Sequence, residues 1–202
     1  MNYKLDGLNL VVVFSDTGKH AIEINELTNL FTKEAPAIFW DNQIPTSPGI
    51  ISYQISGFDI SIFENRYQIQ SKAIDGDIPS YFQKTLKKAL LAAKTRYAIA
   101  YGFNFYFSYK ESREVKDIFN ITIRPTSFSY QPATFLKLTF KKEDALFIIE
   151  VSDGKPALGV HINIHHDENL VLEVLAEKIE EKLSNDFEAT KQLLSEVFGI
   201  AK

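Results

Sequence analysis

Hydrophobic residues recur at every second position along many segments of the chain, and this period of two predicts β-strands. The clearest segment covers residues 97–109, whose other face carries small or mixed-polarity side chains such as Ala98, Gly102 and Asn104. A strand of this kind suits an antiparallel sheet that is covered on one side. Its bulky face comprises Tyr97, Ile99, Tyr101, Phe103, Phe105, Phe107 and Tyr109. Similar patterns predict strands at residues 8–14, 51–55, 58–62, 67–69, 118–123, 135–140, 146–151 and 158–164.

The hydrophobic period changes to three or four residues in other segments, which predicts helices. Residues 24–33 form a short helix ahead of a proline, and residues 79–96 form a longer helix that begins at Pro79. The C-terminal residues form one long amphipathic helix or two joined ones, from Leu172 to a stop at Gly199.

These elements predict an α+β fold, in which an antiparallel sheet of several strands packs against a mid-chain helix and a long C-terminal helix. Short polar turns separate the strands, as at Glu64-Asn65 and Asp153-Gly154. Neither a flexible linker nor an internal repeat divides the sequence. We therefore expect a single compact domain over residues 1–202, with lobes 1–96 and 97–202 as the alternative division.

Composition supports a strand-rich fold and narrows the available chemistry. Aromatic residues make up 13% of the chain, mostly Phe and Tyr, and both types favour half-buried sheet surfaces. Cysteine is absent, which removes disulfides, thiolate metal ligands and cysteine nucleophiles. The N-terminal segment lacks the pattern of a signal peptide, and no apolar run reaches the ~18 residues of a membrane span. We expect a cytoplasmic protein that has no membrane partner.

The formal net charge of −4 argues against a nucleic-acid partner, because nucleic-acid binders usually carry a basic surface. The Gly18-Lys19 pair lacks the leading glycine and the following hydroxyl of a phosphate-binding loop, and no serine lies in a nucleophile-elbow motif. We therefore predict no catalytic residue and no cofactor. A protein partner, or a second copy of the chain, is the expected ligand.

The segment from His161 to Asp167 is the one stretch rich in potential metal ligands. On a strand, His161 and His165 share a face but lie roughly 13 Å apart, which is too far for one ion. His165 and His166 point to opposite faces of the strand. We therefore predict an ordinary polar strand end that meets a helix cap. A metal site formed by His161, His165, His166 and Asp167 is the alternative.

The aromatic strand also offers a candidate binding surface, formed by Tyr101, Phe103, Phe105 and Tyr106. Its pattern is similar to the aromatic strand of RNA-recognition sheets, whose exposed rings stack on bases. The basic residue and the last aromatic residue of that pattern are replaced here by Tyr101 and Ser108. In an acidic chain we expect these rings to line a core or a covered groove rather than to stack on bases.

The order of several features is shared with other proteins. These features are the helix ending in Glu34-Ala35-Pro36, the segment Asn65-Arg66-Tyr67-Gln68-Ile69 ahead of helix 79–96, the aromatic strand at 102–106, and Asp186-Phe187-Glu188-Ala189 in the terminal helix. In this order the chain resembles a sporadically distributed family of uncharacterised prokaryotic cytoplasmic proteins. The resemblance spans nearly the whole chain, although this sequence is shorter between its later strands. It implies a cytoplasmic protein and names no activity.

The sequence supports three hypotheses of function. The leading one is a protein-binding or scaffolding module without catalytic activity, which uses an exposed sheet face or the terminal helix for association. The first alternative is a chaperone-like or antitoxin-associated client binder, because a sheet followed by a long helix is similar to the layout of SecB-type export chaperones. The second alternative is a metal-dependent enzyme built on the segment from His161 to Asp167.

Overall fold

The structure is a computed structural model of the 202-residue chain. It describes residues 3–15, 51–55, 58–63, 65–71, 74, 78, 80–92, 97–110, 114–119, 135–154 and 157–198. The helix predicted at residues 24–33 and most of the strand predicted at residues 118–123 lie outside these ranges.

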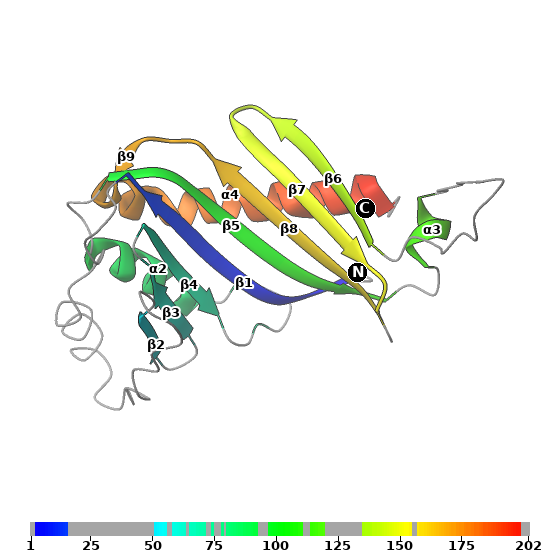
Figure 1. Ribbon diagram of the computed structural model, residues 1–202, viewed down its shortest axis with the longest axis horizontal. Coiled ribbons are helices and arrows are strands. Elements are labelled where there is room, and N and C mark those ends of the chain that lie inside the picture. Colours follow the sequence, from blue (N-terminus) through cyan, green and yellow to red (C-terminus); the bar gives the residue numbers. More distant parts are fainter. Residues whose placement is uncertain are drawn as a thin grey trace, which may run out of the picture.

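The described residues form one sheet of nine strands, accompanied by helices (Figure 1). The strands are β1 (Tyr3–Phe14), β2 (Ile51–Ile55), β3 (Phe58–Ile62), β4 (Arg66–Ser71), β5 (Tyr97–Tyr109), β6 (Phe135–Lys142), β7 (Ala145–Ser152), β8 (Leu158–His166) and β9 (Leu170–Val171). The helices are α2 (Ser80–Ala92), the one-turn α3 (Val115–Ile118) and α4 (Leu172–Phe198). The predicted α+β fold, with a mid-chain helix and a long C-terminal helix, is therefore confirmed.

Strands β1 and β5 lie in the middle of the sheet and join distant parts of the chain. The strand order is β2-β3-β4-β1-β5-β8-β7-β6, with β9 paired to the start of β5. Every pairing among these strands is antiparallel. Because β1 pairs with β5 from Tyr3 to Phe14, segments on either side of residue 96 share one continuous sheet.

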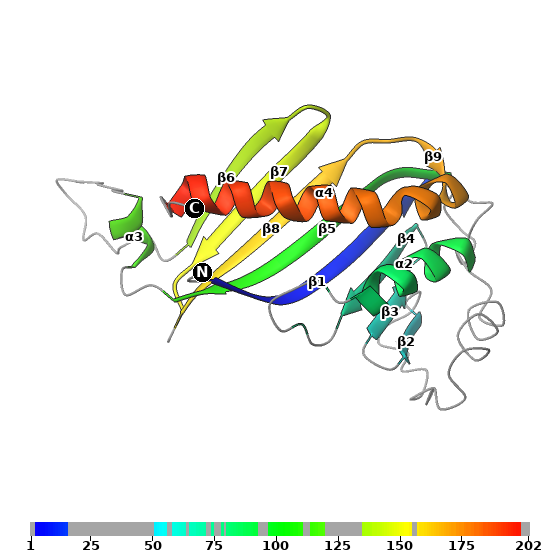
Figure 2. The same ribbon diagram turned by 180° about the vertical axis from the view of Figure 1, so that it is seen from behind.

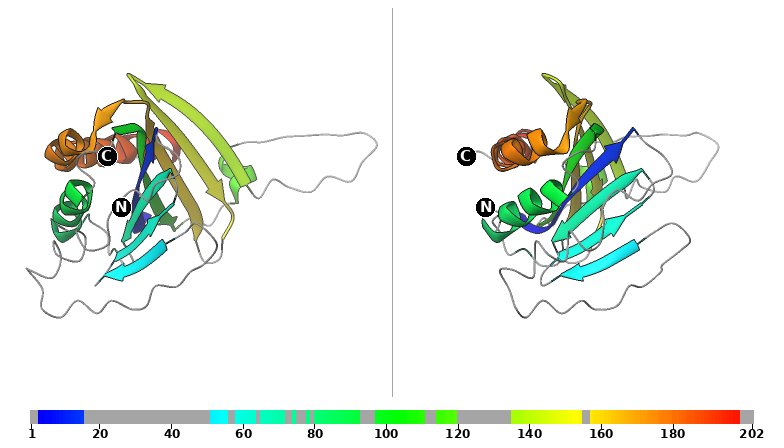
Figure 3. Two further views of the ribbon diagram at one scale, coloured as in Figure 1. Left: turned by 60° about the vertical axis from the view of Figure 1, so that its left-hand side comes forward. Right: turned by 90° about the vertical axis from the view of Figure 1, so that its left-hand side faces the viewer.

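Both long helices pack on the same face of the sheet (Figures 2 and 3). Helix α4 turns its apolar side inward and buries Leu175, Ile179 and Leu183 completely, while α2 packs beside α4. We call this side of the sheet the helix face and the opposite side the outer face. The large apolar side chains of the central strands β1, β5 and β8 lie on the helix face and form the core. They include Leu8, Leu10, Val12, Phe103, Phe105, Phe107, Val160, Ile162 and Ile164.

The aromatic strand β5 departs from its predicted alternation near its start. The odd-numbered side chains are buried from residue 101 onward, whereas Tyr97 and Ile99 are 63% and 41% exposed. The pairing with β1 changes register here, because consecutive β1 residues 13 and 14 face Ala100 and Ala98. Ile99 is the extra residue of this β-bulge, which exchanges the two faces of the strand. The prediction that Tyr97 and Ile99 lie on the same face of the strand as Tyr101 and the later odd-numbered residues is therefore wrong.

The strand predicted at residues 118–123 begins inside a helix instead. Ile118 is the last residue of α3, and the backbone N–H of Val115 at the start of α3 donates to Asp153 Oδ1 at 2.9 Å. Asp153 follows β7, so a carboxylate distant in sequence satisfies an amide that the helix itself leaves free. Local periodicity carries no signal for such a contact.

Replacement of Phe105 tests how α4 packs on the central strand β5. Its ring is completely buried and lies 5.6 Å from the ring of Phe187 on α4, measured between centroids. Replacing Phe105 with alanine leaves a cavity, so we expect the free energy of unfolding in urea to fall by about 3–5 kcal/mol. The control substitution Val174→Ala, on the exposed side of α4, should change it by less than about 0.5 kcal/mol. Equal effects of the two substitutions would contradict this packing.

Candidate functional site

The outer face of the sheet carries a row of polar side chains that crosses four neighbouring strands. The strand register places Gln70 of β4 opposite Asn9 of β1, Asn9 opposite Asn104 of β5, and Asn104 opposite Asn163 of β8. These side chains share one face because each follows or precedes a residue buried under the helices. Segments far apart in the sequence therefore contribute to one continuous polar surface.

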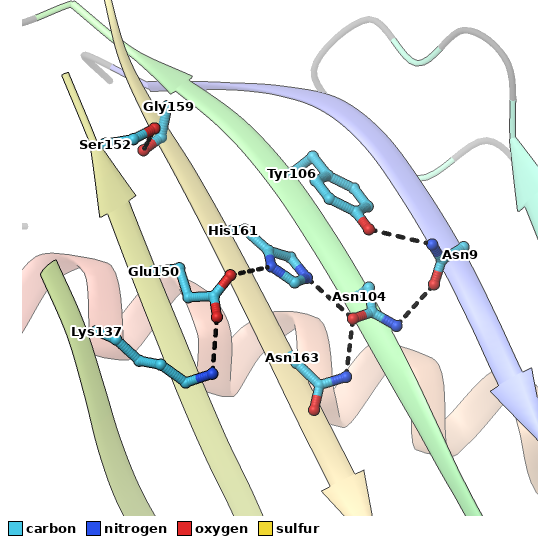
Figure 4. Close-up of polar contacts among 9 residues, drawn as sticks. All are labelled: Asn9, Asn104, Tyr106, Lys137, Glu150, Ser152, Gly159, His161 and Asn163. Atoms are coloured by element: carbon cyan, nitrogen blue, oxygen red, sulfur yellow. Dashed lines mark hydrogen bonds and ion pairs between the residues drawn. The ribbon is translucent and has the colours of Figure 1, made fainter. Parts of the chain in front are cut away.

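The three asparagines of this row are joined by hydrogen bonds (Figure 4). Asn104 Nδ2 donates to Asn9 Oδ1 at 2.7 Å, and Asn163 Nδ2 donates to Asn104 Oδ1 at 2.8 Å. Asn9 and Asn104 are only 4% and 8% exposed, so an unpaired amide in either would cost free energy. The hydrogen bonds meet that requirement and fix the orientation of the side chains.

An ionic branch extends this row toward the edge of the sheet (Figure 4). His161 Nε2 lies 2.9 Å from Asn104 Oδ1, and His161 Nδ1 lies 3.1 Å from Glu150 Oε2. Lys137 Nζ lies 2.9 Å from the other Glu150 oxygen. The hydrogen bonds from Lys137 and His161 hold the pKa of Glu150 below its usual value, so this carboxylate is ionised at neutral pH.

Tyr106 is the most exposed aromatic ring in this cluster. Its ring stacks on the His161 ring with 4.6 Å between centroids and 5° between planes, and its hydroxyl accepts a hydrogen bond from Asn9 Nδ2 at 3.3 Å. The side chain is 36% exposed. The ring is thus held against the sheet while one side of it remains open to solvent. We call Asn9, Asn104, Tyr106, Lys137, Glu150, His161 and Asn163 the outer-face network.

A second polar cluster lies on the helix face, where the end of β8 meets α4. His166 Nε2 lies 2.8 Å from Asp186 Oδ2, and the His166 ring stacks on Tyr101 with 4.7 Å between centroids. Glu168 Oε2 accepts hydrogen bonds from the Tyr101 hydroxyl at 3.2 Å and from Lys182 Nζ at 2.8 Å. We call these residues the helix-edge cluster, because they tie the chain after β8 to α4.

The ionisable groups of the helix-edge cluster bond to one another. Burial raises the pKa of the Tyr101 phenol, and the carboxylates of Glu168 and Asp186 raise it further, so the hydroxyl stays protonated and donates. Burial opposes ionisation of Glu168, but the hydrogen bond and charge of Lys182, with the bond from Tyr101, leave its pKa below the usual value. Each group therefore has its partner within the cluster, which indicates a structural role.

The histidines predicted as alternative metal ligands do not converge. His161 and His165 lie on the outer face, whereas His166 points to α4, as strand alternation predicts. Asp167 bonds to His165, with 2.9 Å between Oδ1 and Nε2. Across the described part of the chain, no group of three or more His, Asp or Glu side chains is placed to hold a metal ion.

The predicted aromatic binding residues divide between the two faces of the sheet. Tyr101, Phe103 and Phe105 are at most 1% exposed and lie in the core under α4, whereas Tyr106 alone of the four points to the outer face. The core placement expected for these rings therefore holds for three of them, and those three have no open face for stacking on a base.

Sequence reasoning did not identify Asn9, Glu150 or Lys137 as site residues. The one available signal was Asn9 itself, a polar residue that interrupts the apolar run 8–14.

The chain matches no protein-family model, and no curated protein matches it. None of the described helices combines the length and the hydropathy needed to cross a membrane. We therefore infer the function of the chain from the geometry of the outer face.

Glu150 gives the outer face a dependence on pH. Because its pKa is lowered in the folded protein, its ion pairs stabilise the fold above the usual glutamate value of 4.5 and cease to do so as the pH falls through the lowered value. We expect the free energy of unfolding to fall more steeply with acidification for the wild type than for Glu150→Gln. Urea denaturation of both proteins between neutral pH and about pH 3 measures the difference. Parallel profiles for the two proteins would refute the assignment.

Proposed function

We propose that this protein is a binding module without catalytic activity that engages a protein partner through the outer face of its sheet. The observation that carries the proposal is the one-sided construction of the sheet within the residues that the structure describes. The helices α2 and α4 cover the helix face, while the outer face carries an ordered hydrogen-bonded network around the exposed ring of Tyr106.

Side chains of the outer-face network are already held in place by hydrogen bonds, and this favours binding of a partner. Association normally costs about 0.5–1.5 kcal/mol for each flexible side chain that it immobilises. Asn104 is already fixed by hydrogen bonds to Asn9, Asn163 and His161, so little of this cost remains for it. Tyrosine is among the residue types that contribute most to interfaces, since its ring is rigid and its hydroxyl can form hydrogen bonds. Tyr106 combines both properties at an accessible position.

Helix α4 is less suited to be the association surface than the outer face is. Its apolar side, which includes Leu175, Ile179 and Leu194, is completely buried against the rest of the chain. Of the two surfaces expected from the sequence, the outer face is therefore the one that we propose for a partner. A cysteine-free chain is compatible with a reducing compartment, and we place this function in the cytoplasm.

The two alternative functions have weaker support in the described residues. A client-binding chaperone needs a contiguous hydrophobic groove, but the exposed large apolar side chains are spread over β5, β6 and α4. They are Tyr97, Ile99, Tyr106, Phe135, Phe140 and Val174. A metal-dependent enzyme needs convergent ligands, and the side chains from His161 to Asp167 point to different faces.

Tyr106→Ala tests the proposed interface. Affinity-tagged wild-type protein is used to capture partners from a lysate of its native cells, and quantitative mass spectrometry compares it with Tyr106→Ala and with the α4 control Val174→Ala. We expect one partner to be enriched with the wild type and the control, and to fall at least about tenfold with Tyr106→Ala, since hot-spot truncation costs about 2 kcal/mol or more. Circular dichroism verifies that all three proteins are folded.

Light scattering coupled to size-exclusion chromatography shows whether the partner is a second copy of the chain or a different protein. If the partner is another copy, the wild type has twice the monomer mass, and Tyr106→Ala returns it to the monomer. Capture of the same partner at equal yield by the wild type and Tyr106→Ala, with loss in Val174→Ala, would place the interface on α4 and reject the proposal.

A further inference from the structure

The outer face is hollowed beside Tyr106. The hollow has a volume of about 300 Å³ and lies over the adjoining ends of β5, β6, β7 and β8. Gly159 of β8 and Ser152 of β7 are paired across the two strands and have the smallest side chains in the lining, so they form its floor. Its walls are Tyr106, His161, Glu150 and Phe135. We call it the Gly159 hollow.

The backbone at Gly159 does not itself require glycine. Its φ lies outside the left-handed region, and an added Cβ would meet only Ser152 Oγ, at 2.9 Å, beyond its chain neighbours. That hydroxyl belongs to a short side chain that can rotate away. The consequence of glycine at this position is the open space above the strand, which a larger side chain would fill.

The walls of the hollow combine the rings of Tyr106, Phe135 and His161 with the carboxylate of Glu150. Phe135 is 53% exposed and Tyr106 is 36% exposed, and one face of the Tyr106 ring is already covered by His161. A cation that lies on the face of an aromatic ring is attracted to it. Among the described residues of the lining, Glu150 supplies the only carboxylate, and an ionised carboxylate can accept more hydrogen bonds than the two from Lys137 and His161.

Lys137 competes for Glu150 but does not block it. Its side chain is 53% exposed, so solvent screens its ion pair with Glu150 and the ammonium group can turn into solvent. The whole chain has a formal charge of −4, which favours a basic partner over an acidic one. The Glu150 carboxylate, the exposed rings and the formal charge of the chain all favour a cationic ligand, which must compete with Lys137 and His161 for Glu150.

We propose that the Gly159 hollow binds the guanidinium group of an arginine side chain. A guanidinium is planar, stacks on aromatic rings, and donates parallel hydrogen bonds to a carboxylate, which matches Phe135, Tyr106 and Glu150 better than an ammonium does. The proposal rests on the proposed function, since the arginine would belong to the protein that docks on the outer face. It names the chemistry that this partner must present.

N-acetyl-L-arginine methylamide is the probe for this site, titrated into the 202-residue chain. Backbone amide shifts of Gly159 and Ser152 in ¹⁵N NMR spectra should change and saturate. The citrulline analogue, which has the same shape without the charge, should bind at least about tenfold more weakly. No saturable shift, or equal binding of the two probes, would overturn the proposal.

Variants of the lining separate the contributions to arginine binding. Gly159→Leu should abolish binding by filling the hollow, and Glu150→Gln should weaken it about tenfold while keeping the shape of the side chain. Lys137→Ala should tighten binding several-fold, because it removes the competing cation. A variant that merely damages the fold cannot produce this gain. Phe140 lies on β6, as Lys137 does, but outside the lining of the hollow, so Phe140→Ala should leave arginine binding unchanged. Undiminished binding by Gly159→Leu would reject the site.

The arginine titration and the capture experiment can fail separately. Absence of arginine binding, together with a partner that is lost in Tyr106→Ala, would reject the Gly159 hollow and retain the outer face as interface. Arginine binding that follows the expected variants, together with capture that is indifferent to Tyr106→Ala, would retain the hollow and reject the proposed interface.

Discussion

The packing of α4 against one face of the sheet is the constraint on which the other features depend. Because side chains alternate along a strand, coverage of one face assigns every second residue of β1, β5 and β8 to the core and its neighbours to the outer face. The buried side of α4 and the rings of Phe103 and Phe105 thereby determine where Asn104 and Tyr106 must point. A register shift by one residue would exchange the two sets, so the apolar packing also fixes the position of the polar network.

The packing of α4 determines that the polar side chains point to the outer face. It does not require them to form a hydrogen-bonded network. Polar side chains on a solvent-exposed sheet face can form hydrogen bonds with water. Asn9 and Asn104 are nearly inaccessible and bond to each other instead. The stacked ring of Tyr106 contributes to their cover by lying against His161. A tyrosine that shields a buried amide network while exposing one side of its ring is suited to receiving a partner, because the network keeps it in place.

The parts of the fold that depend on periodicity were predictable, and those that depend on pairing between distant strands were not. Alternation in residues 101–109 correctly indicated a strand with one bulky face, and the opposite directions of His165 and His166 followed from the same rule. The bulge at Ile99 depends on how β5 pairs with β1, a strand more than 80 residues earlier, and nothing in the local sequence reveals it. The convergence of Asn9, Asn104 and Asn163 likewise exists only once three strands are in register.

The two polar clusters differ in a way that separates structural from binding roles. In the helix-edge cluster, Tyr101 is buried and bonds to Glu168, which also bonds to Lys182, so its interactions hold α4 and the end of β8 together. The outer-face network joins only strands that the sheet already holds through their backbones. Besides satisfying the buried amides of Asn9 and Asn104, its side chains hold the accessible ring of Tyr106 and the ionised carboxylate of Glu150 in place. Groups that are ordered and accessible, and that hold no helix to the sheet, favour recognition on this face.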